Sequence, residues 1–313
     1  MRLEGIHHVT CITGDARRNL DFYTRVLGLR LVAKSVNQDD PTVYHLFYSD
    51  EEGHPGGDIT FFEYPGSRRG RAGAGMVHTV LWRVGTPAAL EFWASRIAAD
   101  GIPVERGEAR VAFHDPEGLR HALVVDATHD EPLIAIHPEI PRDVALRGFD
   151  SVRAYSSDPE RSRPVLEETL GARPAGDATW ELRGSRRGGT IAYDSPPVER
   201  GIPGAGTVHH VAWGATVADH PGWLARLQEH GVHSTPVIDR HYFHSIYFRE
   251  PSGVLFEIAD DGPGFTVDSP VEALGTRIIL PPQFEAYRTQ IEARLTPLPD
   301  PRAGWGQATP SPG

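Results

Sequence analysis

Two pairs of adjacent histidines have the residue type and the setting for metal chemistry. One pair lies in GIHHVT at residues 5–10, and the other lies in the similar stretch TVHHVAW at residues 207–213. Neighbouring side chains of a strand point to opposite faces of its sheet, so only one histidine of each pair can face a shared site. Because imidazole is a common ligand of transition metals, the two stretches together predict half of a metal site.

A carboxylate in an apolar stretch is the third candidate ligand. Glu257 lies in GVLFEIA, among Val, Leu, Phe and Ile. An ionised carboxylate in such surroundings costs free energy unless a cation compensates its charge. Two imidazoles and one carboxylate form the facial triad that suits non-haem Fe(II) and leaves coordination positions open. A three-ligand catalytic zinc site stays open as well, because the ligand types alone do not separate the two metals.

The elements that must position these residues recur four times along the chain. Each copy predicts a strand, a helix and then several strands, with the helices at residues 15–28, 86–101, 158–171 and 219–231. Each helix begins at Asp or Thr and ends at Gly, which is typical of an N-cap and a left-handed C-terminal residue. Four βαβββ copies indicate an internal repeat. This organisation resembles the vicinal oxygen chelate fold, an α+β class in which paired modules form half-open β cups.

Aligning the copies separates the two histidines of each pair. The second histidines and their counterparts share one register, which contains His8, Thr79, Ser151 and His210. Aligning the closing hairpins on their glycines places Glu257 opposite Ala122. Copies one and four therefore keep ligand-type side chains, whereas copies two and three have neutral ones. We expect one cup with a metal and one degenerate cup.

The division of the chain follows from the same pattern. We expect an N-terminal domain of two modules at residues 1–140, a C-terminal domain of two modules at 145–280, and a C-terminal helix with a flexible tail at 281–313. The Gly-rich segments 65–75 and 194–206 are predicted linkers.

Charge and cysteine content exclude several classes of protein. The chain has 313 residues and a formal charge of -11, from 31 basic and 42 acidic side chains. Repulsion from phosphate opposes a nucleic acid or an anionic membrane as partner. The single cysteine, Cys11, excludes an intramolecular disulfide. The sequence contains no apolar run of membrane-spanning length and no secretion signal, so we expect a cytoplasmic protein. A homo-oligomer stays open.

The sequence resembles a known family over nearly its whole length. It is similar to the ring-cleaving dioxygenases of the vicinal oxygen chelate (glyoxalase/bleomycin resistance/dioxygenase) superfamily that act on para-hydroquinones. The resemblance rests on GIHHVTCITGDARRNLDFYTRVLGLRLVAKSVNQDDPTVYHLFY, GTVHHVAW, DRHYFHSIYFREPSGVLFEIADDGPGF and LPPQFEAYRTQIEARL. It implies His8, His210 and Glu257 as ligands of Fe(II), or of Mn(II). It also implies an aromatic diol and O2 as substrates, and opening of the ring with incorporation of both oxygen atoms.

The same resemblance places five further residues near the metal and the substrate. These are His7, Thr10, His209, Arg240 and Tyr247. His209 or Tyr247 is then the candidate acid or base, and Arg240 is suited to stabilise negative charge. Thr10 shares a strand face with His8, whereas His7 points to the other face and is expected to orient the site from behind.

Three further functions on the same fold stay open. A glyoxalase-type isomerase needs a fourth protein ligand, for which Glu63 is the only candidate in copy one. The second is a catechol extradiol dioxygenase, and the third is a small-molecule binding protein without metal. We expect His78 to be structural, and His241 and His244 to be peripheral.

Overall fold

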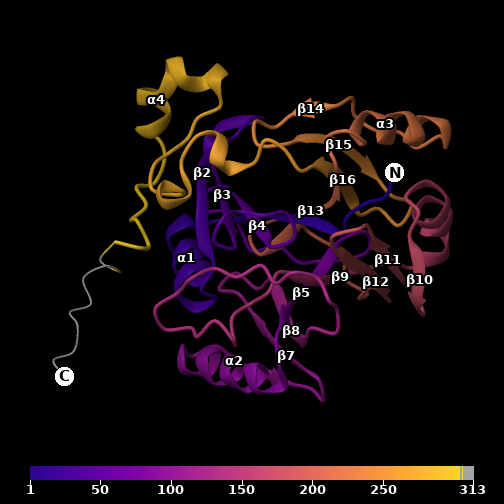
Figure 1. Ribbon diagram of the computed structural model, residues 1–313, viewed down its shortest axis with the longest axis horizontal. Coiled ribbons are helices and arrows are strands. Elements are labelled where there is room, and N and C mark those ends of the chain that lie inside the picture. Colours follow the sequence, from indigo (N-terminus) through magenta and orange to yellow (C-terminus); the bar gives the residue numbers. More distant parts are fainter. Residues whose placement is uncertain (304, 306–313) are drawn as a thin grey trace.

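The strands form two eight-stranded mixed sheets, as shown in a computed structural model that describes residues 1–303 and 305 (Figure 1). The first sheet has the order β14-β15-β16-β13-β1-β4-β3-β2. Its strands are β1 (Ile6–Thr13), β2 (Arg30–Asn37), β3 (Asp40–Ser49), β4 (Asp58–Glu63), β13 (Thr207–Ala215), β14 (Ile238–Asp239), β15 (His244–Arg249) and β16 (Leu255–Asp260).

The second sheet has the order β10-β11-β12-β9-β5-β8-β7-β6. Its strands are β5 (Val77–Val84), β6 (Glu105–Arg106), β7 (Arg110–His114), β8 (Arg120–Val125), β9 (Phe149–Tyr155), β10 (Arg173–Gly176), β11 (Thr179–Arg183) and β12 (Gly188–Asp194). Strands and helices alternate as four βαβββ modules, which confirms the predicted fold class.

The first module pairs with the fourth, and the second module pairs with the third. Strand β1 of module one pairs with β13 of module four, and β5 of module two pairs with β9 of module three. Each sheet therefore combines strands from both halves of the chain. The division into domains at residues 1–140 and 145–280 stays a prediction, and the sheets cross that boundary.

The strand pairing confirms the predicted repeat register. In the first sheet Thr10 pairs with His210, and His8 pairs with Ala212 two residues along. The centre of the second sheet repeats this relation, with the pairs Thr79–Arg153 and Leu81–Ser151. His8 and His210 are thus equivalent to each other and to the neutral residues of the second sheet.

Three of the four module helices match their predictions. The helices are α1 (Ala16–Asp21), which continues as a π-helical turn (Phe22–Val26), α2 (Pro87–Ala99) and α3 (His220–Glu229). The Asp15 side chain accepts hydrogen bonds from the first turn of α1, and Thr86 does the same for α2. The third module instead has a 3-10 turn (Pro159–Ser162) and a π-helical turn (Val165–Thr169). Pro164 lacks an N–H group and interrupts the α-helical hydrogen bonding there.

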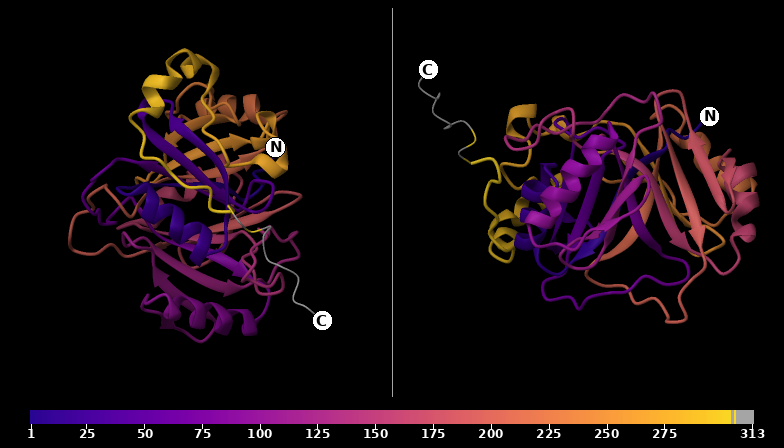
Figure 2. Two further views of the ribbon diagram at one scale, coloured as in Figure 1. Left: turned by 90° about the vertical axis from the view of Figure 1, so that its left-hand side faces the viewer. Right: turned by 90° about the horizontal axis from the view of Figure 1, so that it is seen from below.

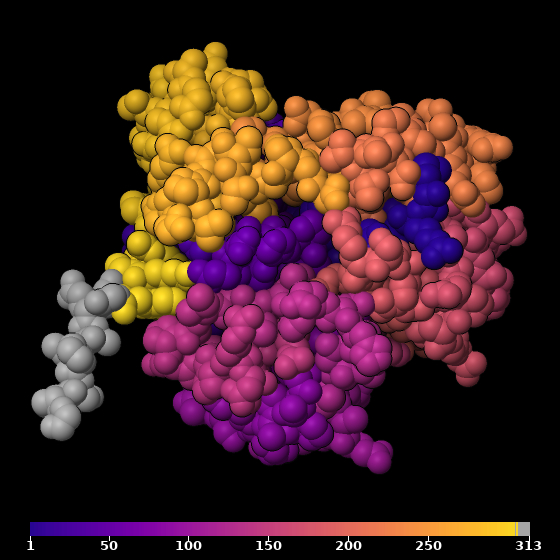
Figure 3. Space-filling view, viewed as in Figure 1, coloured from indigo at the N-terminus to yellow at the C-terminus, as the bar shows by residue number. Residues whose placement is uncertain are grey.

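The predicted linkers and tail pack against other parts of the molecule. Arg71 and Ile202, one from each linker, exchange backbone hydrogen bonds of 2.8 Å. Beyond the 3-10 turns (Phe265–Val267, Val271–Ala273 and Pro282–Tyr287) and α4 (Arg288–Glu292), the C-terminal segment returns to the first module (Figures 2 and 3). There Arg302 forms an ion pair with Glu51. The rest of the predicted tail, residues 304 and 306–313, lies outside the described residues.

No helix among the described residues has both the length and the apolar composition that crossing a membrane requires. Cys11 is a buried free thiol.

Candidate metal centre

Three ligand-type side chains converge at the centre of the first sheet. His8 on β1, His210 on β13 and Glu257 on β16 come from three adjacent strands. The Nε2 atoms of the two histidines are 3.3 Å apart, and Glu257 Oε2 lies 3.1 Å from His8 Nε2 and 2.9 Å from His210 Nε2. All three residues are buried, with exposed fractions of 1%, 4% and 0%. The register that the repeat predicts thus brings together the three predicted ligands.

The spacing and the charge of this cluster fit a metal ion. An octahedral ion with bonds of about 2.1 Å separates neighbouring ligand atoms by about 3 Å, which is the spacing of these three atoms. Glu257 Oε2 makes no hydrogen bond among the described residues, although two imidazole nitrogens lie beside it. Burial opposes the charge of this carboxylate, but His8 and His210 hold the pKa of Glu257 well below its usual value. The buried anion therefore needs a cation, and the three atoms are arranged to bind one on one face.

Each doubled histidine consists of one candidate ligand and one orienting partner. The Asp260 carbonyl accepts a hydrogen bond of 3.0 Å from His7 Nε2, so the other nitrogen of a neutral His7 ring is an acceptor. His7 Nδ1 then accepts from His8 Nδ1 at 2.9 Å, which leaves the lone pair of His8 Nε2 facing the cluster. His209 Nδ1 and His210 Nδ1, at 2.8 Å, repeat the arrangement.

The position equivalent to Glu257 in module one is occupied by Thr60. Glu257 pairs with Ala212, two residues after His210, whereas Thr60 pairs with Thr10, two residues after His8. Glu63 does not point to the cluster as a fourth ligand, because its carboxylate accepts a hydrogen bond from Ala16 N at the start of α1. The cluster therefore has three candidate protein ligands, and a hydroxyl group lies where a four-ligand site would have a carboxylate.

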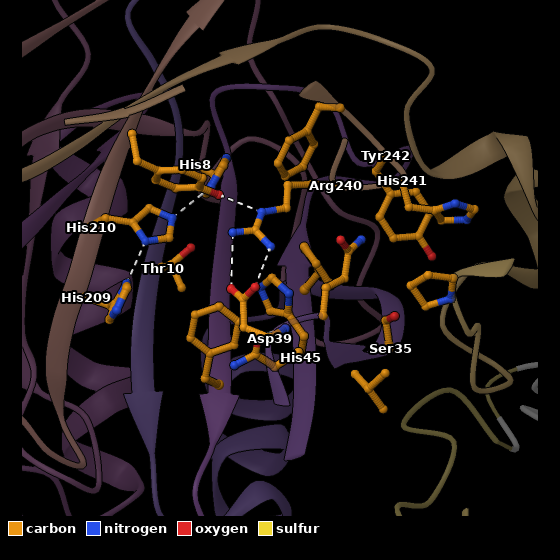
Figure 4. Close-up of a pocket in the computed structure, with 18 of the residues that line it drawn as sticks. His8, Thr10, Ser35, Asp39, His45, His209, His210, Arg240, His241 and Tyr242 are labelled. Atoms are coloured by element: carbon orange, nitrogen blue, oxygen red, sulfur yellow. Dashed lines mark hydrogen bonds and ion pairs between the residues drawn. The ribbon is translucent and has the colours of Figure 1, made fainter. Parts of the chain in front are cut away.

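A cavity of about 340 Å³ opens on the cluster, and Figure 4 shows most of its lining side chains. Six aromatic side chains from modules one and four line it, together with polar groups from the same modules. The aromatic lining residues are Phe47, Phe62, Tyr64, Tyr242, Phe243 and Tyr247. Such walls suit a flat apolar ligand that has a few polar groups.

Comparison with known proteins places this site in a family. The profile of the Glyoxalase/Bleomycin resistance protein/Dioxygenase superfamily matches residues 5–123 and 148–258. The chain belongs to this superfamily.

Two curated relatives and one solved structure are similar to the chain over nearly its whole length. The "Putative ring-cleaving dioxygenase MhqO" of Bacillus subtilis (strain 168) is 42% identical over 302 residues, 94% of this chain and 96% of the relative. The "Chlorohydroquinone/hydroquinone 1,2-dioxygenase" of Sphingobium indicum is 31% identical over 311 residues, 93% of this chain and 95% of the relative. A crystal structure of a "putative dioxygenase" from Bacillus subtilis has a TM-score of 0.89 at 40% identity, and the match covers 96% of this chain and 98% of that one.

The five other site residues predicted from the sequence do not all lie in the cavity. Thr10, His209, Arg240 and Tyr247 line it, whereas His7 lies behind His8. Arg240 Nε donates to Tyr247 Oη at 3.2 Å, and the guanidinium also reaches Asp39 across the mouth (Figure 4). Burial alone would lower the pKa of Arg240, but Tyr247 and Asp39 raise it, so this residue stays cationic. Desolvation and the charge of His210 lower the pKa of His209 to about 4, so its ring is neutral. Because its Nδ1 accepts a hydrogen bond from His210, the ring hydrogen is on Nε2, which can act as a donor.

The three histidines that were expected to lie outside the site have partners of their own. His78 Nε2 contacts Asp194 at 2.9 Å in the second sheet, and His244 Nδ1 contacts Asp260 at 2.9 Å. His241 lines the cavity, but its Nε2 is engaged with Asp268 at 2.6 Å.

Sequence reasoning missed the polar groups that module one contributes from β2 and β3. His45, Ser35, Asn37 and Asp39 all line the cavity. The available signal was His45 itself, which lies in YHLFY on the predicted strand after the first helix. The repeat alignment did not single it out, because it contains no counterpart of this histidine.

Proposed function

We propose that the protein is a metal-dependent ring-cleaving dioxygenase that opens an aromatic para-hydroquinone with both atoms of O2. Fe(II), or Mn(II), would be held by His8, His210 and Glu257. The observation that carries the proposal is the buried three-ligand cluster opening into an aromatic cavity. Similarity to a relative named as a hydroquinone 1,2-dioxygenase supports the substrate class.

The residues around the cluster have roles that suit this chemistry. When bound, the metal supplies the redox coupling between a diol and dioxygen, and the open positions of a facial triad leave room for both. The aromatic walls bind the ring and exclude water. Arg240 would stabilise negative charge on a substrate oxygen, and the Nε2–H group of neutral His209 can donate a hydrogen bond to such an oxygen. The Tyr247 hydroxyl, whose pKa is raised by burial, stays protonated and can donate a hydrogen bond.

Metal analysis and oxygen uptake test this function. Protein purified without oxygen should contain iron or manganese, and an oxygen electrode should record uptake with hydroquinones in preference to catechols. His210→Ala and Glu257→Ala should lose both the metal and the uptake. Ser151→Ala, at the register position of His210 in the second sheet, is the matched control and should keep both.

The outcomes separate this function from its competitors. Metal and hydroquinone-dependent uptake retained in both ligand variants would contradict the proposed site. Uptake with catechols alone would indicate a catechol extradiol enzyme. Turnover of methylglyoxal and glutathione without oxygen uptake would indicate a glyoxalase-type isomerase.

A further inference from the structure

A polar chain leads from the candidate metal site across the floor of the cavity. Thr10 Oγ1 and Thr60 Oγ1 are 2.8 Å apart, and Thr60 Oγ1 is 2.9 Å from His45 Nε2. Both threonines are 0% exposed, so water does not compete for these hydrogen bonds. The His45 ring is also held between Phe47 and Phe62, with centroid distances of 3.9 and 4.4 Å. Its orientation is therefore fixed.

We propose that His45 binds the second hydroxyl group of the ring substrate and that Thr60 positions its ring for this contact. The inference rests on the proposed function, because a second hydroxyl exists only if the substrate is a diol. It deepens that function by naming the group that distinguishes a para diol from an ortho diol.

The strand order places His45 at the right side of the cavity for this role. The strands lie in the order β13, β1, β4, β3, and they carry His210, His8, Thr60 and His45 in turn. Strands are about 4.8 Å apart, so β3 lies about 10 Å across the sheet from β1. In Figure 4 His45 accordingly lies away from His210, toward Ser35. A para diol held at the candidate metal site by one oxygen would have its other oxygen across the ring, toward this side, whereas the adjacent oxygens of an ortho diol would both lie near that site.

The free nitrogen of His45 is available to such a hydroxyl. His45 Nδ1 has no hydrogen-bond partner among the described residues, and the side chain lines the cavity. Three other polar groups of the cavity lining are engaged: Asn37 with Tyr64, Arg240 with Asp39, and His241 with Asp268.

The threonine chain lets His45 act as donor or as acceptor. If Thr60 donates to Nε2, the ring hydrogen is on Nδ1 and points to the cavity; if Nε2 donates to Thr60, Nδ1 presents a lone pair. Burial and the charges of His8, His210 and Arg240 lower the pKa of His45 well below its usual value, which keeps the ring neutral. A hydroxyl group both donates and accepts, so it fits either state.

Ligand binding without turnover tests this assignment. Metal-loaded protein is titrated anaerobically by calorimetry with hydroquinone, catechol and phenol, which lacks the second hydroxyl. The wild type should bind hydroquinone about ten-fold more tightly than phenol, the effect of one buried hydrogen bond. His45→Phe should abolish this ratio and leave the catechol-to-phenol ratio unchanged. His45→Asn, whose amide can reach the position of Nδ1, should restore part of it, and Thr60→Val should reduce it by loosening the ring.

The failure of this inference differs from the failure of the proposed function. If His45→Phe and Thr60→Val bind metal and keep the wild-type ratio of hydroquinone to phenol, His45 does not bind the second hydroxyl. If the wild type consumes no oxygen with any hydroquinone, the proposed function itself is wrong. Should His45→Phe fail to fold, the ratios of His45→Asn and Thr60→Val decide the question, since an unchanged ratio in both overturns it.

Discussion

Removing the His7 ring nitrogens should weaken metal binding although His7 is not a candidate ligand. His7 is 5% exposed, and burial and the charge of His8 lower its pKa to about 3, so its ring is neutral and its Nδ1 accepts from His8. In His7→Phe the His8 Nδ1–H group loses its buried partner, which costs about 1–3 kcal/mol. The hydrogen of His8 can then move to Nε2, where it points at the cluster and must leave before a metal binds. We expect metal affinity to fall about 10- to 100-fold.

A competition titration measures this effect. Wild type and His7→Phe are equilibrated anaerobically with Fe(II) or Mn(II) and a chelator of known affinity, and the bound metal is measured. His78→Phe is the matched control, because His78 is the register counterpart of His7 beside the neutral Thr79 of the second sheet. His78→Phe should bind metal as the wild type does. Affinity of His7→Phe within two-fold of the wild type would refute the proposed hydrogen-bond direction.

Three further predictions concern charge and buried hydrogen bonds. Burial raises the pKa of Asp58 from 3.8 to about 7, so its stabilising contribution is full below pH 3.8 and is lost as the pH rises through about 7. The unfolding free energy of the metal-free wild type should fall by up to about 4 kcal/mol between pH 4 and pH 8 because of this group, and that of Asp58→Asn should not. If urea unfolding gives wild type and Asp58→Asn the same pH profile, this prediction is wrong. Arg240→Ala should lower kcat/KM for hydroquinone oxygen uptake about 100-fold, and unchanged turnover would remove its role. Tyr23→Phe removes a hydroxyl that contacts Asp115 at 3.1 Å and His121 at 2.9 Å, so urea unfolding should show a loss of about 1–3 kcal/mol, and a stability equal to the wild type would count against that network.

The candidate ligands could be predicted because the internal repeats of one sequence can be aligned with one another. His8 and His210 follow equivalent first strands, and Glu257 follows a hairpin glycine that module two shares. Module one has its glycine at Gly56, four residues before Thr60, but this glycine lies in a longer connection without the D/E-P-x-G pattern of the other two hairpins. Its equivalence is evident from its φ of 111°, close to the 101° of Gly118 and the 104° of Gly253, and from the parallel pairing of β4 with β1. The sequence therefore favoured Glu63, the nearest carboxylate, whereas the pairing places Thr60 at the equivalent position.

His45 could not be predicted for a related reason. Its place depends on β3 lying beside β4, which in turn lies beside β1, and this lateral order is a tertiary property of the sheet. Periodicity along one strand contains no information about it. The third helix shows a local counterpart, since Pro164 follows a 3-10 turn where module one has an α-helical turn, whereas both modules have the π-helical turn.

The pairing of module one with module four has a consequence for how the protein is made. His8 and His210 are separated by 202 residues, so the site has a very high contact order. During synthesis β1 leaves the ribosome well before β13, and the edge of β1 that pairs with β13 stays open until that strand follows. Glu257 emerges later still, so a nascent chain cannot bring the three candidate ligands together until β16 has left the ribosome. If these residues bind a metal as proposed, its capture coincides with closure of the first sheet, and a cell short of the metal accumulates chains whose last folding step lacks the free energy of metal binding.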